Sequence, residues 1–397
     1  MRDSTWPIVI LIAIFSVTVA GESDWPGKRG PRDNWSTDAP VGFPGTGVRV
    51  AWRAQVGTGS SGVAVVGNAL VTIGNQDNQD SVCCFDTVTG GERWRVRYPA
   101  KLEERGYEGG PNANPTIVGD RVFTLSRQGL LLCLALADGH EVWRHDLVAD
   151  RVPQPNYGFS SAPVLADGLV VLNIGAHGRA FDAASGVLRW ESGLRADGYS
   201  SAVVAMIGNE RAVLIFSRTA VSAARLADGK KLWSQPWAVK HAVADPLLVG
   251  ERVLVTHAYG SGSILLDLAT GERERAFPQM CFAGLLYPPV RIGEHLYGSS
   301  GDKNAGDLRC LSLDGTVRWR DHTLESGNSI AVGNWLVMLT RHGTLAVIEA
   351  SAERFQLRWR SQLLSGTCWT HPVCAGGRLI VRDADGNLVS LDIIQGQ

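Results

Sequence analysis

The sequence predicts an all-β protein, an eight-bladed β-propeller closed by a strand from its own N-terminus. Three observations carry this prediction. A motif made of an acid, a glycine four residues later and a tryptophan four residues after that recurs about every 40 to 50 residues. Glycine-containing turns recur with the same period. The final copy of the motif is divided between the two ends of the chain.

The first complete copy of the motif is Asp86, Gly90 and Trp94. Its glycine favours a tight turn, because residues with a Cβ resist the left-handed conformation. The flanking β-branched and aromatic residues favour strands on both sides of that turn. One copy has arginine in place of tryptophan, and two later copies differ in length. The tryptophan or arginine slots are Trp94, Trp143, Trp190, Trp233, Arg275, Trp319 and Trp359.

A second series of turns gives an independent count of the blades. Each turn separates two short apolar runs, as in a tight hairpin between the first two strands of a blade. The series contains eight members, which equals the seven motif slots plus the one supplied by the termini. The turns are Gly67-Asn68, Gly119-Asp120, Asp167-Gly168, Gly208-Asn209, Gly250-Glu251, Gly293-Glu294, Gly333-Asn334 and Gly376-Gly377.

The two ends of the chain are expected to complete one blade together. Residues 48–54, with Trp52, resemble the last strand of a repeat whose first part is missing. That first part lies at the other end, where Asp392 and Gly396 begin the motif again without a following tryptophan. Closing a ring in this way removes two exposed sheet edges. We therefore expect a closed propeller.

Length and composition agree with one repeat domain. A chain of 397 residues could form several domains, but a repeat array remains one unit because each repeat packs on its neighbours. Apolar residues make up 45%, and 46 glycines with only 19% charged residues suit many short strands and turns. The net charge of -1 lacks the basic footprint of a nucleic-acid-binding protein. We expect no nucleic-acid partner and a monomer.

The N-terminus resembles an export signal. Arg2 precedes an apolar run at 8–20 that is short for a membrane span, and Thr18 and Ala20 occupy plausible cleavage positions. We therefore divide the chain into a signal peptide (1–20), an irregular lead-in (21–47) and the propeller (48–397). The protein is expected to be periplasmic or secreted. An uncleaved segment would be its only membrane contact.

The repeated skeleton, shown by Asp86, Gly90 and Trp94, resembles that of the PQQ-like (quinoprotein alcohol dehydrogenase-like) β-propeller family, and the resemblance covers residues 25–392. The opening around Trp25 is similar to that of exported bacterial PQQ-like repeat proteins. The family includes quinone-dependent dehydrogenases and a non-catalytic lipoprotein that helps to assemble outer-membrane β-barrels. The resemblance implies docking between blades for Trp52, Trp94, Trp143, Trp190, Trp233, Trp319 and Trp359.

The seven cysteines do not form an obvious disulfide pattern. Dehydrogenases of the family hold the quinone beside a disulfide of adjacent cysteines, and Cys83-Cys84 would be the match. However, Cys84 shares its position in the repeat with Cys133 and Cys310, which predicts small buried core residues. Cys368 and Cys374 could pair only if neighbouring strands present them to each other.

Candidate binding residues lie in the long connections between blades. These connections share one face of a propeller, opposite the glycine turns, and rigid strands that present variable loops are a common setting for binding sites. His241 and His371 are predicted to lie in first strands, facing the central channel. The candidates are Asn114, Tyr157, Phe159, Tyr199, His241, Asp245, Asn328, Trp369 and His371.

The sequence is compatible with two main functions. The first is an exported, non-catalytic module that binds a protein, a small molecule or a saccharide on its loop face; the aromatic loops alone suggest the saccharide. The alternative is a PQQ-dependent alcohol or sugar dehydrogenase with Ca²⁺ and a divergent site. The residues show no zinc motif and no Ca²⁺-binding loop pattern. No cofactor and no metal site are expected.

Overall fold

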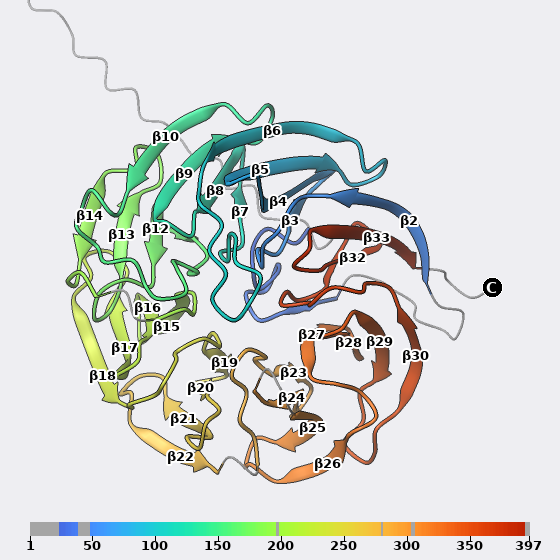
Figure 1. The fold of residues 1–397 in the computed structure, drawn as a ribbon. Helices are drawn as coiled ribbons and strands as arrows, with labels where there is room; N and C mark the ends of the chain where they lie inside the picture. The colour runs from blue at the N-terminus through green and yellow to red at the C-terminus, as the bar shows by residue number, and fades with distance from the viewer. Residues whose placement is uncertain (1–23, 39–47, 196–197, 279–280, 303–305, 394–397) are drawn as a thin grey trace, which may run out of the picture.

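The computed structural model describes residues 24–38, 48–195, 198–278, 281–302 and 306–393. Within this part of the chain the regular elements are strands, arranged as eight sheets around a central axis (Figure 1). The eight-bladed all-β fold predicted from the repeats is confirmed. Among the described residues no helix is long and apolar enough to cross a membrane.

Each blade runs from an innermost to an outermost strand. Blades 1 to 4 are β3 (Ala64–Val66), β4 (Ala69–Gln76), β5 (Gln79–Asp86), β6 (Glu92–Pro99); β7 (Thr116–Val118), β8 (Arg121–Leu125), β9 (Leu130–Ala135), β10 (Glu141–Asp146); β11 (Val164–Ala166), β12 (Leu169–Leu172), β13 (Arg179–Asp182), β14 (Leu188–Glu191); β15 (Val203–Ile207), β16 (Glu210–Phe216), β17 (Ala220–Arg225), β18 (Lys231–Pro236). Blades 5 to 8 are β19 (Leu247–Val249), β20 (Arg252–Thr256), β21 (Ser263–Asp267), β22 (Arg273–Phe277); β23 (Val290–Ile292), β24 (His295–Gly301), β25 (Gly306–Ser312), β26 (Val317–Asp321); β27 (Gly327–Val332), β28 (Trp335–Thr340), β29 (Thr344–Glu349), β30 (Leu357–Gln362); β31 (Val373–Ala375), β32 (Arg378–Arg382), β33 (Asn387–Ile393), β2 (Val48–Gln55).

The tryptophan slot of each repeat follows a bulge in its outermost strand. In blade 1, Cys84 lies opposite Trp94 and Phe85 lies opposite Glu92, so Arg93 is the extra residue. The same register shift occurs between the last two strands of all eight blades. Because a bulge re-aims the following side chain, the tryptophan turns toward the neighbouring blade.

The tryptophans bond and pack across the joints between blades. Trp190 donates its indole N–H to the carbonyl of Leu226 at 2.8 Å, and its ring covers Gly229 of the next blade. A Cβ at Gly229 would lie 2.5 Å from that ring, and its φ of +70° also favours glycine. Equivalent hydrogen bonds to the next blade are made by Trp52, Trp94, Trp143, Trp233 and Trp319.

Arginine replaces tryptophan at the joint between blades 5 and 6. The Nη1 of Arg275 donates to the carbonyl of Asp314 at 2.7 Å, the hydrogen bond that an indole makes elsewhere. The apolar packing at this joint is supplied by Phe277, whose ring lies against Gly315. Arginine and phenylalanine thus divide between them the two tasks of the tryptophan.

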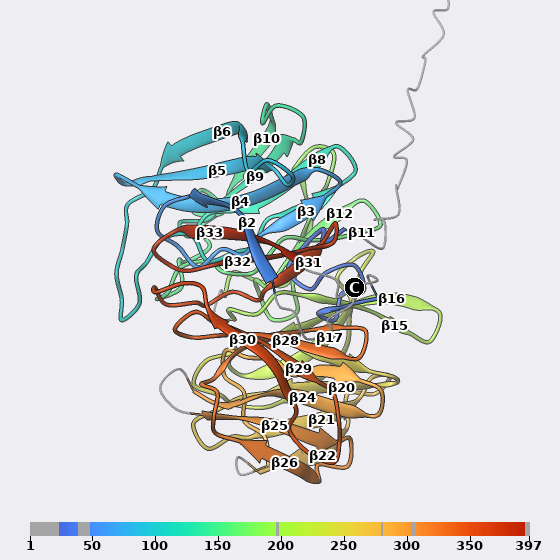
Figure 2. The same cartoon turned by 90° about the vertical axis from the view of Figure 1, so that its right-hand side faces the viewer.

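The N-terminal strand closes the ring. β2 pairs antiparallel with β33 from Val48 opposite Ile393 to Gln55 opposite Asn387, as the split repeat predicts (Figure 2). Arg382 of the same blade is buried and donates to Thr72 Oγ1 and the Ile73 carbonyl in blade 1, at 2.7 and 2.8 Å. The closure therefore joins blades 8 and 1 both through Trp52 and through this arginine.

The lead-in enters the central channel as a hairpin, which we call the channel hairpin (residues 24–38). Trp25 forms two backbone hydrogen bonds with Val65 of innermost strand β3, and β1 (Ser36–Thr37) pairs in parallel with β27, the innermost strand two blades away. Trp25 and Trp35 are completely buried. The described part of the lead-in carries one two-residue strand, β1, and lies along the axis.

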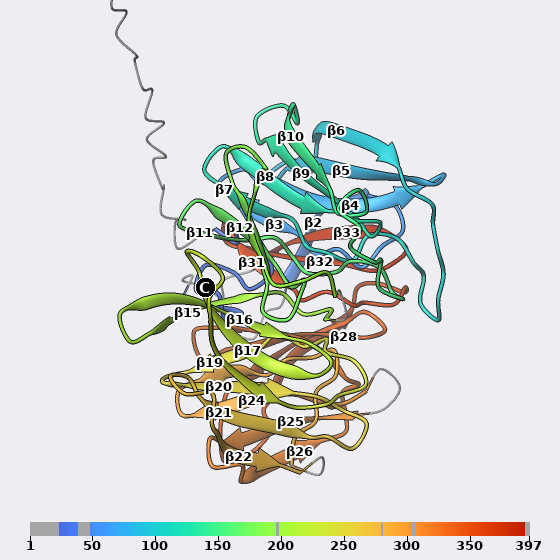
Figure 3. The ribbon, with the colours of Figure 1, turned by 90° about the vertical axis from the view of Figure 1, so that its left-hand side faces the viewer.

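The two faces of the disc differ. Seen from the edge, the β15–β16 hairpin, with its glycine turn, projects on the left, and the long connection from β6 to β7 hangs on the right (Figure 3). The docking turns lie on the glycine-turn face, since Thr87 N donates to Asn68 O of the first hairpin. Asp24 binds the Gly67 amide on that face, so the channel hairpin enters from the side opposite the connections.

The docking contact predicts different costs for two glycine substitutions. Gly229→Ala should lower the free energy of unfolding by about 2 to 4 kcal/mol, because it adds a collision with the Trp190 ring to backbone strain. The matched control is Gly208→Ala, which has a similar φ of +59° and open space around the new Cβ. It should cost only about 1 kcal/mol. Urea denaturation measures both, and equal costs would contradict the docking role of Gly229.

Candidate functional site

A cavity of about 260 Å³ lies at the loop-face end of the central channel. Most of its walls come from residues that shortly precede the first strands of blades, and seven of the eight blades contribute. The channel hairpin adds Lys28. The lining residues are Lys28, Ser60, Arg105, Gly106, Tyr107, Asn112, Asn114, Tyr157, Ser160, Tyr199, His241, Val243, Ala244, Asp245, Tyr259, Leu285, Leu286, Pro288, Trp369, Thr370 and His371.

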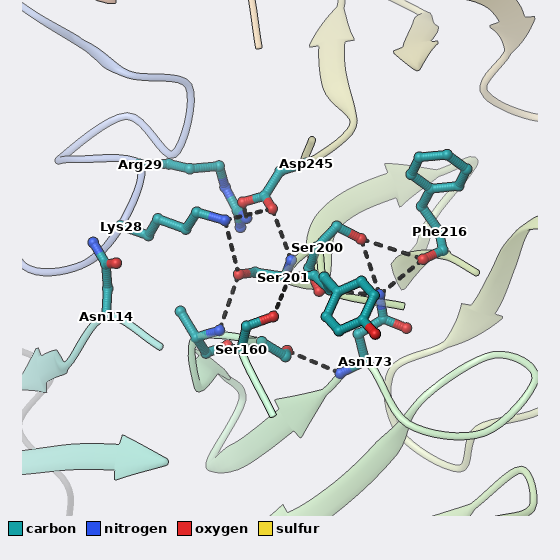
Figure 4. Close-up of polar contacts among 12 residues, drawn as sticks. Lys28, Arg29, Asn114, Ser160, Asn173, Ser200, Ser201, Phe216 and Asp245 are labelled. Carbon is teal, nitrogen blue, oxygen red and sulfur yellow. Dashed lines mark hydrogen bonds and ion pairs between the residues drawn. The ribbon is translucent and has the colours of Figure 1, made fainter. Parts of the chain in front are cut away.

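A buried carboxylate and two cations form the floor of this cavity (Figure 4). Asp245 lies just before β19 with its side chain fully buried, and each of its oxygens contacts a different cation. Lys28 Nζ lies 2.7 Å from Oδ1, and Arg29 Nη1 lies 2.8 Å from Oδ2. The amide of Ser201 donates to Oδ1 at 2.7 Å. Three of the roughly four acceptor positions of the carboxylate are therefore in use.

The charged side chains on the floor keep one another ionised. Burial tends to raise the pKa of Asp245, but Lys28 and Arg29 outweigh it and hold that pKa below its usual range. Burial tends to lower the pKa of Arg29, but the two carboxylates of Asp33 and Asp245 raise it. Asp245 is therefore a permanent anion, with the wrong pKa for a general base that must take up a proton near neutral pH.

Hydrogen bonds between blades hold the floor in place. Arg29 Nη2 donates to the Ala202 carbonyl at 2.8 Å, and the hydroxyl of Ser201 accepts the Ala162 amide at 3.0 Å. Beside them, Asn173 Nδ2 donates to Ser200 O and Phe216 O (Figure 4). The channel hairpin and blades 3, 4 and 5 thus meet at one polar cluster beneath the cavity.

Aromatic rings surround the mouth of the cavity. Tyr157 lies at the centre of the group, with ring centroids 6.2 Å from Tyr107, 5.7 Å from Tyr199 and 5.8 Å from His241. Tyr259 continues the group at 6.3 Å from His241. Tyr157 and Tyr259 remain 38% and 43% exposed, respectively. Such rings offer apolar edges and faces together with polar hydroxyl groups.

The two cavity histidines are held neutral. His371 stacks on Trp35 of the channel hairpin at a centroid distance of 5.4 Å, and burial, assisted by Lys28, lowers its pKa to about 3. The pKa of His241 is also lowered, by burial first and then by Lys240 and Arg218. Both rings therefore serve as uncharged surfaces near pH 7.

The structure brings seven of the nine candidate residues to this cavity, namely Asn114, Tyr157, Tyr199, His241, Asp245, Trp369 and His371. The other two lie elsewhere. Phe159 is buried in the core between blades 2 and 3, against Gly129. Asn328 lies in β27 and donates to the Trp369 carbonyl at 2.9 Å.

The prediction that His241 and His371 lie in first strands is wrong. They precede β19 and β31, because those strands begin only at Leu247 and Val373. In this fold the innermost strands are short, and the incoming connections complete the channel wall. The side chains therefore reach the axis from loops at one end of the channel.

Sequence reasoning missed several lining residues, above all Lys28 with its neighbour Arg29. Their position could have indicated burial, because these two adjacent cations lie between Gly27 and Gly30 in a segment whose tryptophans require burial. A buried cation pair needs a carboxylate. No spacing in the sequence links these residues to Asp245, which lies more than 200 residues away.

All seven cysteines are free thiols. Cys83 and Cys84 are fully buried on β5, where neighbouring side chains point to opposite faces, and they belong to different core clusters. Burial raises the pKa of the Cys84 thiol to about 11. Cys84, Cys133 and Cys310 lie opposite Trp94, Trp143 and Trp319 in their ladders.

The repeats and the axial cavity define an eight-bladed propeller of PQQ-like type. The family model described as outer membrane protein assembly factor BamB matches residues 102–314 and 304–397, more than half of the chain. The chain belongs to this family. No curated protein sequence matches it significantly.

Solved structures share the fold at low sequence identity. BamB from Moraxella catarrhalis is 15% identical, with a TM-score of 0.63 over 89% of this chain and 99% of that one. Quinohemoprotein alcohol dehydrogenase from Comamonas testosteroni is 14% identical, with a TM-score of 0.69 over 96% and 83%. A europium-containing methanol dehydrogenase is 12% identical, with a TM-score of 0.66 over 93% and 89%. At these identities the likeness concerns the fold alone.

The residues of the axial cavity do not fit PQQ with Ca²⁺. Asp245 is the one carboxylate among the lining residues, and both its oxygens already face cations. A Ca²⁺ ion needs six to eight oxygen ligands, and no group of three or more His, Cys, Asp or Glu side chains could hold a metal in the described part of the chain. The adjacent pair Cys83-Cys84 does not line the cavity.

The buried ion cluster predicts unequal effects for the two acidic partners of Arg29. Asp245→Ala should lower the free energy of unfolding by about 3 to 5 kcal/mol, because it leaves Lys28 and Arg29 without their buried counter-ion. Asp33→Ala is the matched control, since Asp33 contacts the same arginine but is half exposed. Its cost should stay below about 1 kcal/mol. Denaturant unfolding at pH 7 tests this; a smaller effect for Asp245 than for Asp33 would refute the cluster.

The low pKa of His371 predicts acid sensitivity. A histidine whose pKa falls from its ordinary 6.5 to about 3 on folding contributes stability that is present above pH 6.5 and lost as the pH falls toward 3. Between pH 7 and pH 5 the loss from this group should be about 2 kcal/mol. His371→Phe keeps a ring against Trp35 and should remove that part of the loss. Urea titrations at both pH values test this prediction, and identical pH dependence in parent and variant would contradict it.

Proposed function

We propose that this protein is an exported, non-catalytic binding module whose ligand occupies the axial cavity. The observation that carries the proposal is the state of Asp245, a buried carboxylate paired with both Lys28 and Arg29 and hydrogen-bonded to the Ser201 amide. A carboxylate held in this way can shape and charge a cavity. It offers neither an open metal position nor a base that can accept a proton.

The walls of the cavity support the same proposal. Pockets that bind small molecules combine aromatic and apolar walls with a few polar groups that set orientation. Here Leu285, Leu286 and Pro288 supply an apolar wall, while Asn114 and Ser160 supply polar groups. The family description as an outer-membrane assembly factor is consistent with a binding role and with export, and the signal-like N-terminus agrees.

The alternative function is quinone-dependent oxidation of alcohols or sugars. One experiment separates the two. Purified protein is titrated with PQQ and Ca²⁺ while cofactor absorbance and dye reduction with alcohols and sugars are followed. We expect no turnover, because the one carboxylate that lines the cavity is already paired with two cations, which also hold its pKa below its usual range. Tight PQQ binding with dye reduction that is lost in Asp245→Asn would overturn the proposal.

A further inference from the structure

The ammonium of Lys28 is only partly engaged by the protein. It donates to Asp245 at 2.7 Å, and its second contact, to the Ser201 hydroxyl, is long at 3.5 Å. An ammonium carries three N–H donors. The Lys28 side chain remains 21% exposed and lines the cavity, whereas Arg29 beside it is buried. One donor of a cation is thus available at the floor.

Among the side chains that line the cavity, cations outnumber carboxylates. Lys28 and Arg105 line it together with a single carboxylate, Asp245, which also pairs with Arg29. Two more acids lie just outside the lining, Glu103 at 3.9 Å from Arg105 and Glu108 on the Trp369 indole, so Lys28 is the cation that faces the cavity floor. The other carboxylate on Arg29, Asp33, is half exposed and therefore screened by solvent.

The upper part of the cavity suits a small polar ring. Aromatic side chains lie at the mouth, and the walls also include neutral hydrogen-bonding groups of Ser60, Asn112, Asn114, Ser160 and Thr370. Some of these groups already bond within the protein, such as Ser160 Oγ to the Tyr199 carbonyl, and each keeps further acceptor or donor positions. Aromatic faces pack on the C–H face of a sugar, and amides and hydroxyls satisfy its hydroxyl groups. A volume of about 260 Å³ limits the occupant to one or two rings.

We propose that the axial cavity binds a monoanionic sugar, with its carboxylate or sulfate on Lys28 and its ring among the tyrosines at the mouth. This inference rests on the proposed binding function and names its ligand class. Lys28 offers a point charge that serves either anion, since a lysine, unlike an arginine, imposes no planar, forked geometry. The channel hairpin therefore contributes a ligand-binding residue in addition to filling the channel.

Calorimetry with four probes tests this proposal: glucuronate, glucose 6-sulfate, glucose and the neutral methyl ester of glucuronate. We expect the two anions to bind at least about tenfold more tightly than the two neutral sugars, as one charge-assisted hydrogen bond allows. Lys28→Gln should remove most of this preference. Lys230→Gln, on an exposed docking turn of blade 4, is the matched control and should change nothing.

A second measurement keeps the test valid if Lys28→Gln is unstable. Binding of glucuronate to the unaltered protein should weaken as salt is raised, whereas any binding of glucose should not. Equal affinity for charged and neutral sugars, or no sugar binding at all, would overturn the inference while leaving a binding function for another ligand. PQQ turnover in the earlier experiment would overturn both. Tighter binding of either anion, or of both, supports it.

Discussion

The ring depends on contacts between the outermost strand of one blade and the turn of the next, which at five joints place a tryptophan ring against a glycine. A four-stranded blade has two apolar faces and cannot bury them alone, so stability comes from its neighbours. The indole covers the turn, and its N–H satisfies a backbone carbonyl that would otherwise be lost at the joint, as in Trp190 with Leu226. The bulge before each tryptophan aims the ring. The substitution of Arg275 shows that the hydrogen bond and the packing can be separated between two residues.

The channel hairpin determines which charged groups line the central channel, because it brings Lys28 and Arg29 to Asp245. In the absence of this segment, Asp245 would be a buried anion facing the channel. When the segment is in place, the carboxylate forms ion pairs with Lys28 and Arg29. Lys28 and His371, which stacks on Trp35, then line the cavity. The cavity at the axis of this chain is lined by a lysine, several tyrosines and two neutral histidines.

The sequence was sufficient to predict the fold because its signals are local and repeated. Gly90 with Trp94 identifies a turn and a bulged strand, and eight such signals count the blades. The face of the site was also predictable, since connections on that side are long. The burial of each side chain on that face could not be predicted. Phe159 and Tyr157 are two residues apart in the same loop, and only tertiary packing sends the first into the core and the second to the cavity. The partnership of Lys28 with Asp245 joins distant segments and leaves no pattern in the sequence.

The position of the N-terminal segment has a consequence for how the chain reaches its final state. The channel hairpin needs Asp245 from blade 5 and β27 from blade 7, and β2 needs β33 from the last blade. The earliest part of the propeller to be synthesised is therefore among the last to find its partners. Contacts of such long separation fold slowly. Until blade 5 is made, the two cations of the hairpin lack their carboxylate, and until blade 8 is made, β2 is an unpaired edge strand. The cavity floor can therefore assemble before the ring closes, and a chain that ends before blade 8 would lack the closure.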